Sequence, residues 1–192
     1  MTADPYLRPS GVLDNLLGLD DAEALVRAEA RIVVARELLL YRSNAVPATW
    51  NLDHVCAVHR WLFGDVYAWA GQLRSIDIVK GATRFASAEF LESAGRDLFR
   101  RRLDPRTRWR SMERTRVVSE CSGFLAELNL LHPFREGNGR TQRAFVQLLA
   151  VDAGWLVDWS SISPEENEAA SERSIADDDA FAPLLERALR RR

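Results

Sequence analysis

The residues best suited to chemistry lie close together, between His132 and Arg143. His132 stands directly before Pro133, and the residue before a proline is disfavoured in the α region, so a helix that reaches this point should end at His132. An imidazole with an unperturbed pKa of about 6.5 is largely neutral near pH 7 and can accept a proton from a hydroxyl group. His132 is therefore a candidate general base.

The residues that follow predict a site for phosphate groups. Gly137, Asn138 and Gly139 permit backbone conformations that most residues avoid, and they stand where the next helix should begin. Free N–H groups and the positive end of the helix dipole make such a position favourable for anions. Arg140 and Arg143 lie three residues apart on that helix, so both can reach one anion and bind its oxygens with two donors each.

Glu136 precedes this turn, where a carboxylate can hold Mg²⁺ against the phosphates that the ion neutralises. A hydroxyl that had lost its proton to His132 could then attack a phosphorus bound over residues 137–139. Each residue alone also fits a plainer interpretation, in which a glycine-containing helix start carries a surface histidine and a structural Glu–Arg pair. Their combination within residues 132–143 favours the catalytic interpretation.

Apolar residues at helical spacing predict the elements that position this segment. Helices are expected over about 20–41, 51–69, 87–102, 109–131 and 138–153, with one or two more in 163–192. The expected buried stripe of the first helix is Leu25, Ala28, Ile32, Ala35 and Leu39. That of the 109–131 helix is Val117, Cys121, Phe124, Leu128 and Leu131.

One segment has the alternation of a strand instead. Residues 73–79 alternate between apolar and polar types, residues 80–83 are typical of a turn, and residues 84–86 can form a returning strand. A single hairpin is only marginally stable, so it must lean on the helices. The fold class expected is all-α, a helical bundle of about seven to eight helices with one small β-hairpin.

Composition excludes several classes of protein. The 192 residues carry a net charge of −2, without the basic excess of a protein that mainly binds nucleic acid. Arginines between 100 and 116, around Pro105, are interpreted as a solvated connector. No apolar run is long enough to span a membrane, and the N-terminus lacks the pattern of a signal peptide. Cys56 and Cys121 are interpreted as buried thiols, so we expect a cytoplasmic protein without direct nucleic-acid or membrane contacts.

At this point the sequence resembles a known family. Residues 132–143 read HPFREGNGRTQR and match the Fic signature, HPFx(D/E)GNGRxxR, at every defined position. Residues 59–74, followed by Lys80, Gly81 and Phe85, resemble the helix and flap that precede this signature in Fic proteins. Residues 4–7 and 12–18 resemble the start of the compact bacterial Fic toxins, so the resemblance covers about residues 4–190.

The resemblance implies one Fic domain over residues 1–192. Its parts would be a lead-in at about 1–19, a flap hairpin at about 73–86, the active-site loop and helix at 132–153, and C-terminal helices at about 163–192. It also implies an activity, the transfer of AMP from ATP to a hydroxyl of a target protein with release of pyrophosphate.

The resemblance assigns each residue a role in that reaction. His132 would be the base, Glu136 would bind Mg²⁺, and Phe134 would be a buried anchor of the signature. An anion hole would be formed by Gly137, Asn138 and Gly139, with Asn138 also orienting the α-phosphate. The outer phosphates would be bound by Arg140 and Arg143. A flap that holds a target segment by strand addition would include Ile76, Ile78, Lys80 and Phe85.

Many Fic proteins are inhibited by a glutamate in a motif (S/T)xxxE(G/N), which pairs with the arginine that corresponds to Arg143. The nearest matches in this chain begin at Ser161 and Ser10, and each fails at one defined position. The resemblance therefore implies a separate small antitoxin that carries the glutamate. It also implies type II topoisomerase subunits, those of DNA gyrase or topoisomerase IV, as targets.

Two alternatives stay open on the same residues. Doc-like relatives transfer a phosphoryl group and have lysine at the position of Gly139, where this chain has no side chain to crowd the phosphates. A catalytically idle interaction module is the other alternative, which the intact His132, Glu136 and arginines disfavour. His54 and His59 are five residues apart, which does not suit shared metal ligation, and are interpreted as ordinary helix residues.

Overall fold

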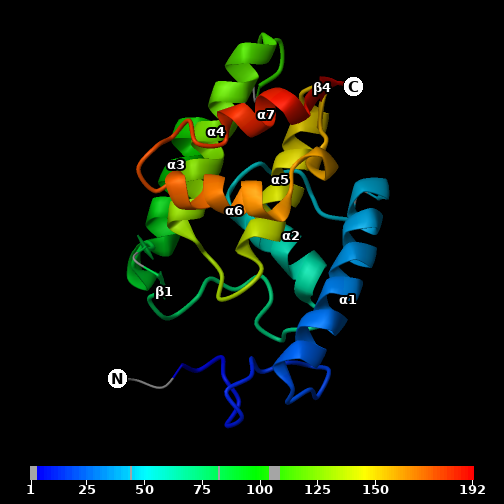
Figure 1. The fold of residues 1–192 in the computed structure, drawn as a ribbon, viewed down its shortest axis with the longest axis vertical. Helices are drawn as coiled ribbons and strands as arrows, with labels where there is room; N and C mark the ends of the chain where they lie inside the picture. Colours follow the sequence, from blue (N-terminus) through cyan, green and yellow to red (C-terminus); the bar gives the residue numbers. More distant parts are fainter. Residues whose placement is uncertain (1–3, 44, 82, 104–108) are drawn as a thin grey trace.

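The computed structural model of the protein describes residues 4–43, 45–81, 83–103 and 109–192. Within these ranges the chain is mostly helical, as predicted, with seven α-helices and two small antiparallel strand pairs (Figure 1). The helices are α1 (Ala22–Arg42), α2 (Leu52–Phe63), α3 (Leu91–Arg102), α4 (Arg114–Leu131), α5 (Asn138–Asp152), α6 (Pro164–Arg173) and α7 (Ala182–Ala188). The strands are β1 (Val79–Lys80), β2 (Thr83–Arg84), β3 (Trp155–Val157) and β4 (Leu189–Arg191). None of these helices is both long and apolar enough to cross a membrane.

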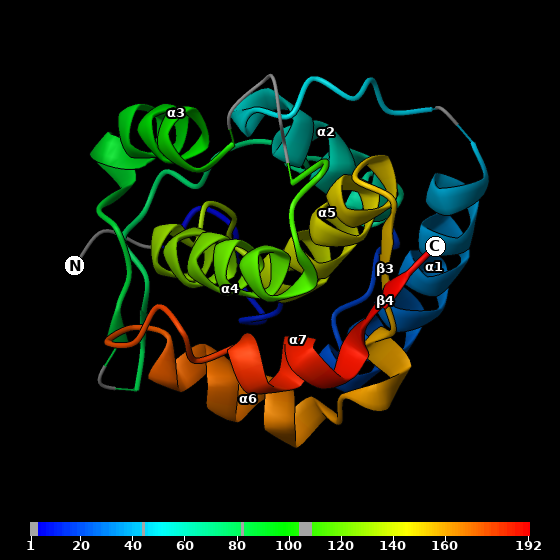
Figure 2. The same ribbon diagram turned by 90° about the horizontal axis from the view of Figure 1, so that it is seen from above.

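Helices α4 and α5 form the centre of the fold, and they flank the segment 132–137. Figure 2 shows α2 and α3 on one side of this pair, α6 and α7 on the other, and α1 at the edge. Helix α4 contacts α3, α5 and α7, while α5 also contacts α2. Three phenylalanine rings meet in the core, with the centroid of Phe124 5.4 Å from that of Phe99 and 5.8 Å from that of Phe145. The candidate chemistry therefore lies on a link between two buried helices.

Local signals place several helix boundaries correctly. Asp21 caps α1 by accepting a hydrogen bond from the Ala24 N–H at 2.6 Å, and Asn51 caps α2 by accepting from the His54 N–H at 3.0 Å. Such side chains satisfy N–H groups that the first turn leaves without partners. The predicted stripe of α4 is confirmed, since all five of its members are buried.

The predicted buried stripe of α1 is wrong in part. The buried residues are Leu25, Glu29, Val33 and Leu40. Ala28 and Ile32 are only half-buried, Ala35 is exposed, and Leu39 is 52% exposed. The helix is turned by about one residue relative to the prediction because its inner face includes a glutamate, which a pattern of apolar residues does not count.

Helix α2 ends at Phe63, well before the predicted end near Trp69. The N–H groups of Val66 and Tyr67 both donate to the Phe63 carbonyl, so turns replace the helix after this residue. The Val66 carbonyl accepts from the Leu16 N–H of the N-terminal segment at 2.8 Å. Val66 is nevertheless fully buried, because the turn folds it back onto the core, and its spacing therefore resembles that of a helix.

The predicted hairpin exists but is much shorter than residues 73–86. Only Val79 with Arg84 and Lys80 with Thr83 are paired, and residue 82 lies outside the described residues. Residues 73–78 form no strand, because Arg74 turns inward and its N–H donates to the Pro133 carbonyl at 2.9 Å. The alternation in the sequence reflects this buried arginine rather than a sheet with one polar face.

The prediction of a lone hairpin is wrong, because β3 pairs with β4 and forms a second small sheet. These three-residue strands lie more than thirty residues apart, so no local pattern marks their pairing.

Two helices also begin later than predicted. Helix α3 follows a 3₁₀ turn (Ala88–Phe90), at which the Ser87 side chain makes no capping bond, and α4 begins at Arg114. Of the two thiols predicted to be buried, Cys121 is buried and Cys56 is only half-buried.

The arginine-rich connector is described only in part, since residues 104–108 lie outside the described ranges. Next to it, Arg101 and Arg102 both pair with Glu127, and Arg110 pairs with Asp152 at 2.6 Å. These cations are therefore neutralised within the chain.

Replacing Phe145 by alanine should lower the free energy of unfolding by about 3–5 kcal/mol, because its ring packs against Phe99 and Phe124 in the fully buried core. Urea denaturation measures this change. Leu38→Ala on the exposed face of α1 (54% exposed) is the control, with an expected change within about 0.5 kcal/mol. Equal effects of the two substitutions would contradict this assignment of the core.

Candidate active site

His132 ends helix α4, as its position before proline predicts. Its backbone is left-handed, with φ of 46° and ψ of 61°, and its N–H donates to the Leu128 carbonyl at 3.1 Å. The imidazole stacks on Phe85 of the flap, with ring centroids 3.8 Å apart. Its Nδ1 lies 3.3 Å from the Asn129 carbonyl, which can only accept, so Nδ1 carries the proton and Nε2 keeps its lone pair.

The surroundings of His132 favour the neutral ring. Burial lowers the pKa of His132 to about 4, and the charges of Arg74 and Lys80 act in the same direction. The hydrogen bond with the Asn129 carbonyl opposes them. The ring is thus an uncharged base across the physiological pH range.

The loop between the two central helices is closed by Asn138. The side-chain oxygen accepts from the Phe134 N–H at 2.9 Å, and the amide nitrogen donates to the Phe134 carbonyl at 2.8 Å. Gly137 has a φ of 78°, and a Cβ there would lie 2.4 Å from the Phe63 ring, so only glycine fits. Phe134 itself is 1% exposed, which confirms that it is buried. The loop is therefore fixed by contacts within the motif itself.

The start of α5 presents free donors. The first intrahelical bond runs from the Thr141 N–H to the Gly137 carbonyl, so the N–H groups of Asn138, Gly139 and Arg140 come before it. Gly139 is exposed, and a Cβ built there would contact only Arg143 Nη1, at 3.5 Å. The guanidinium of Arg143 thus lies over the helix start, where anions are favoured.

Arg140 is held by a buried carboxylate that the sequence analysis missed. Its Nη1 lies 2.5 Å from Glu29 Oε1, and its Nη2 lies 3.3 Å from Glu136 Oε1. Glu29, on α1, also accepts from the Tyr67 hydroxyl at 2.5 Å, and its side chain is 7% exposed. The charge of Glu29 and burial together raise the pKa of Tyr67, with burial the larger cause. The Arg140 guanidinium also lies over the Phe63 ring, with Cζ 4.8 Å from the ring centroid.

Arg143 differs from Arg140 in its partners. Among the described residues, no carboxylate lies within ion-pair distance of Arg143. Burial lowers the pKa of its guanidinium, and the charge of Glu37 opposes that shift. The Glu37 carboxylate instead accepts from the Tyr41 hydroxyl at 2.7 Å. Arg143 is therefore available to an external anion.

Glu136 has the properties of a metal ligand. Its side chain is 43% exposed, and its Oε1 accepts from the Gly137 N–H at 2.8 Å and contacts Arg140. The other carboxylate oxygen has no hydrogen-bond partner within the described part of the chain. A free carboxylate oxygen beside a phosphate site suits Mg²⁺, which binds through one or two carboxylates together with substrate phosphates.

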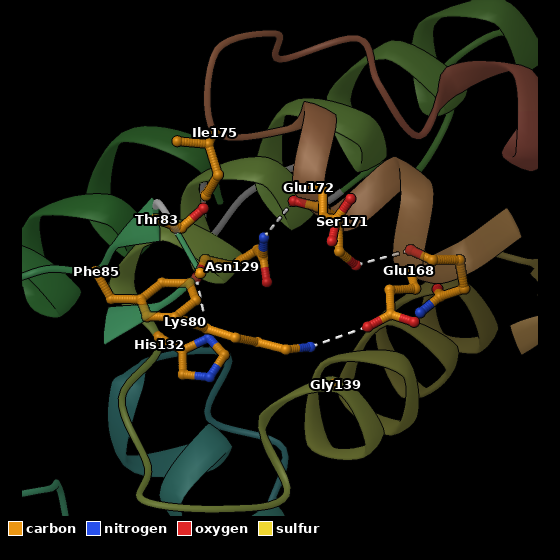
Figure 3. A pocket seen from close by; sticks show the side chains of 12 residues that line it. Lys80, Thr83, Phe85, Asn129, His132, Gly139, Glu168, Ser171, Glu172 and Ile175 are labelled. Atoms are coloured by element: carbon orange, nitrogen blue, oxygen red, sulfur yellow. Dashed lines mark hydrogen bonds and ion pairs between the residues drawn. The ribbon is translucent and has the colours of Figure 1, made fainter. Parts of the chain in front are cut away.

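His132 and Gly139 border a cleft of about 660 Å³ (Figure 3), whereas Glu136 and Arg140 line a separate cavity of about 520 Å³ together with Glu29 and Tyr67. The flap forms one wall of the cleft, α6 forms the other, and the floor consists of the end of α4 and the start of α5. Its lining is Lys80, Gly81, Thr83, Phe85, Asn129, His132, Gly139, Asn167, Glu168, Ser171, Glu172 and Ile175. Lys80 Nζ spans the mouth of the cleft to Glu168 Oε1 at 3.0 Å.

A comparison with protein families decides the classification. The family described as Fic/DOC matches residues 49–150, which include the histidine, the phosphate turn and both arginines. This chain belongs to the Fic/DOC family. The signature residues 132–143 cover the loop after α4 and the first turns of α5.

Similar sequences are found along nearly the whole Fic chain. It is 38% identical to "Protein adenylyltransferase VbhT" of Bartonella schoenbuchensis over 188 residues, which are 97% of this chain and 39% of that protein. It is 33% identical to "Probable protein adenylyltransferase Fic" of Salmonella typhimurium, over 97% of this chain and 92% of that protein. The chain thus spans well under half of the first relative but nearly all of the second.

A solved structure shows the same fold. The BepC protein of Bartonella tribocorum, determined with bound AMPPNP, superimposes with a TM-score of 0.89 over 97% of both chains. At 21% sequence identity this similarity concerns the fold alone.

The predicted site residues divide between two cavities: His132 and Gly139 line the cleft, while Glu136 and Arg140 line the other. Of the flap residues, Lys80 and Phe85 line the cleft. Ile76 and Ile78 do not line it and are half-buried beside it. Asn138, predicted to orient a phosphate, has both polar side-chain atoms bonded to the Phe134 backbone.

His59 has a role that the sequence analysis missed. Its Nδ1 accepts from the Gly71 N–H at 2.8 Å, which leaves Nε2 to donate to the Glu136 carbonyl at 3.0 Å. Its ring stacks on Phe134 with centroids 3.9 Å apart. His59 thus supports the signature loop from α2. His54 is a buried helix residue, and among the described residues no group of three or more His, Cys, Asp and Glu side chains is arranged to hold a metal ion.

The ring of His132 should titrate near pH 4 instead of about 6.5, since burial lowers its pKa. Two-dimensional ¹H–¹³C NMR of the imidazole resonances measures this, with His132→Ala giving the assignment. Burial lowers the pKa values of His54 and His59 to about 4 as well.

The unfolded chain in urea provides the control, with all three rings titrating near the ordinary value of about 6.5. The folded state binds these protons less readily than the unfolded state. The contribution of these histidines to the free energy of unfolding is therefore fully present above about pH 6.5 and is lost as the pH falls toward 4. A His132 midpoint near 6.5 in the folded protein would contradict the assignment.

Proposed function

We propose that this Fic protein transfers AMP from ATP to a hydroxyl group of a target protein. The observation that carries the proposal is the placement of His132. An uncharged imidazole, with Nε2 free, borders a cleft whose floor is the start of α5. The relatives named as adenylyltransferases over nearly the whole chain support the same activity.

In the proposed step, the target hydroxyl gives its proton to Nε2 of His132 while its oxygen bonds to the α-phosphorus. The bond from that phosphorus to the oxygen bridging to the β-phosphate breaks, and pyrophosphate leaves with the electron pair. The protein is left joined to AMP through a phosphodiester. Because the pKa of His132 is lowered to about 4, the ring releases its proton to water readily afterwards.

The phosphates have ready partners. The free N–H groups at the start of α5 face the transferred phosphate, and Arg143 meets the outer phosphates. Arg140 can exchange its 3.3 Å contact with Glu136 for a phosphate oxygen while Glu29 still holds it. Glu136 would hold Mg²⁺, which when bound neutralises phosphate charge.

The flap is the proposed dock for the target. Within the described part of the chain, strands β1 and β2 are paired with each other alone, so their outer edges can bond to an added strand. Val79 is 62% exposed on this hairpin. A segment bound along this edge runs past Phe85 and brings its hydroxyl to His132, because these two rings are stacked.

With Mg²⁺ and ATP labelled at the α-phosphate, the purified protein should label itself or a target protein. His132→Ala should reduce the rate by at least about 100-fold because the base is lost. Chelation of the metal should stop labelling. Autoradiography of gels measures all three results, and purified subunits of DNA gyrase and topoisomerase IV are the targets that we propose.

The position of the label separates this activity from its alternatives. Incorporation from γ-labelled ATP alone would overturn AMP transfer and show phosphoryl transfer. Absence of incorporation from either label, with ATP bound, would show an interaction module instead. Arg116→Ala, an exposed substitution at the far end of α4, is the control and should label at the rate of the unchanged protein.

We further propose that a separate antitoxin regulates this toxin-like enzyme in the cytoplasm. Neither partial match to the inhibitory motif reaches Arg143. Glu165, the glutamate of the first match, interacts with its own backbone N–H and with the Ser163 side chain, and Asp14 of the second match is paired with Arg8. The half-buried Arg143 guanidinium is therefore open to a glutamate from another chain, the interaction expected of a small protein carrying (S/T)xxxE(G/N).

Arg143→Ala should weaken both ATP use and inhibition by such a protein, since one guanidinium serves both. We expect KM for ATP to rise at least about tenfold, with the inhibitor's Kd rising in parallel, because each loses a charge-assisted pair. Steady-state labelling and calorimetry measure the two quantities, with Arg116→Ala as control. Unchanged binding of the inhibitor would exclude the Glu–Arg mechanism.

A further inference from the structure

Arg74 is the most deeply buried charged side chain near the site, at 2% exposed. No carboxylate lies within ion-pair distance of it among the described residues. Burial lowers the pKa of Arg74, and the charge of the Asp77 carboxylate opposes that shift, but Asp77 forms its ion pair with Arg84, at 3.1 Å. A buried charge is unfavourable unless hydrogen bonds replace its water, so the contacts of this guanidinium decide why it is there.

Among the residues that the structure describes, the Arg74 side chain donates only to backbone carbonyls, and these come from separate parts of the chain. Its Nε donates to the His132 carbonyl at 2.8 Å, and Nη2 reaches the Leu131 carbonyl at 3.4 Å. Its Nη1 donates to the Ile76 carbonyl at 2.5 Å, and Nη2 also donates to the Ala86 carbonyl. One side chain thus joins the end of α4 to both arms of the flap.

The end of α4 needs such a donor. The last carbonyls of a helix have no partners within it, and the left-handed turn at His132 directs two of them toward Arg74. A cation is also favoured by the dipole at a helix C-terminus. Arg74 therefore caps the helix that presents the base.

The flap needs the same contacts. Its ladder contains only two residue pairs, which cannot hold a hairpin in place alone. The Ala86 N–H donates to the Leu130 carbonyl at 3.1 Å, while the Ala86 carbonyl is held by Arg74. Phe85, the preceding residue, stacks on His132. Fixing Ala86 therefore fixes the ring that contacts the imidazole.

We propose that Arg74 is a positioning residue that couples the flap to His132, so that target docking and the base are aligned by one guanidinium. The consequence for AMP transfer rests on the proposed function. The coupling itself is a property of the fold and can be measured without activity.

The charge of Arg74 gives a second readout. Facing His132 are Arg74, Lys80 from the flap and the Asn129 carbonyl of α4. From α6, Glu168 is paired with Lys80 and Glu172 lines the cleft. Arg140 of α5 is directed to Glu29. Removing the Arg74 cation should therefore raise the pKa of His132, because one of the two charges that lower it is lost.

Two variants separate geometry from charge. Arg74→Met keeps the length of the side chain but removes both the charge and the donors. Arg74→Lys keeps the charge, but its three donors sit on one atom and cannot span the four carbonyls. Arg116→Met, exposed at the other end of α4, is the matched control.

Amide hydrogen exchange at Phe85 and Ala86 should accelerate at least about tenfold in both Arg74 variants and stay unchanged in Arg116→Met. The pH midpoint of the His132 titration, measured by NMR, should rise in Arg74→Met and stay near the wild-type value in Arg74→Lys. The kcat for AMP transfer should fall about 100-fold in both variants, the effect of misplacing a base by about 1 Å.

Exchange rates in both variants equal to those of the control would overturn the coupling. If Arg74→Met does not fold, exchange in Arg74→Lys alone decides the question in the same way. If the original protein transfers no AMP, the proposed function fails, while exchange and titration still decide whether Arg74 couples the flap to His132.

Discussion

The left-handed turn at His132 is the constraint on which the rest of the site depends. It ends α4 and directs the chain through Pro133 so that α5 can begin six residues after His132. A β-carbon disfavours this conformation, so surrounding contacts must hold it. The turn has a functional consequence, because it places an imidazole and a helix N-terminus beside the same cleft. A base and a phosphate site thereby come from adjacent residues of the sequence.

Three buried polar side chains hold this turn, and each does so by satisfying backbone groups. Arg74 bonds to the carbonyls at the end of α4, His59 bonds to the Glu136 carbonyl, and Asn138 bonds to both polar groups of Phe134. A buried backbone group without a partner costs about 1–3 kcal/mol. The loop is therefore stable only while these side chains are in place, so its shape depends on polar contacts as well as on apolar packing.

This explains what could be predicted from the sequence. His132, Glu136 and the turn at Gly137 are recognisable because proline, glycine and charged residues act on their immediate neighbours. The partners Glu29, His59 and Arg74 come from 58 to 111 positions away, and an apolar pattern treats each as an interruption. The same reason accounts for the rotated α1 stripe, whose inner face includes Glu29, and for the missed pairing of β3 with β4. Not every failure has this cause, since the early end of α2 reflects local turns after Phe63 that bury Val66 at helical spacing.

The two signature arginines differ in a way that their spacing does not reveal. Glu29 and the Phe63 ring hold Arg140 in place before any ligand binds, so little reorganisation is needed when a phosphate arrives. Arg143 lies over the start of α5 without such a carboxylate among the described residues. An anion that binds there gains a new ion pair, whereas one that binds Arg140 must share it with Glu29. If the proposed inhibitor binds Arg143 as well, it would compete there with the nucleotide, and occupancy of this one residue would determine whether ATP can bind beside the base at His132.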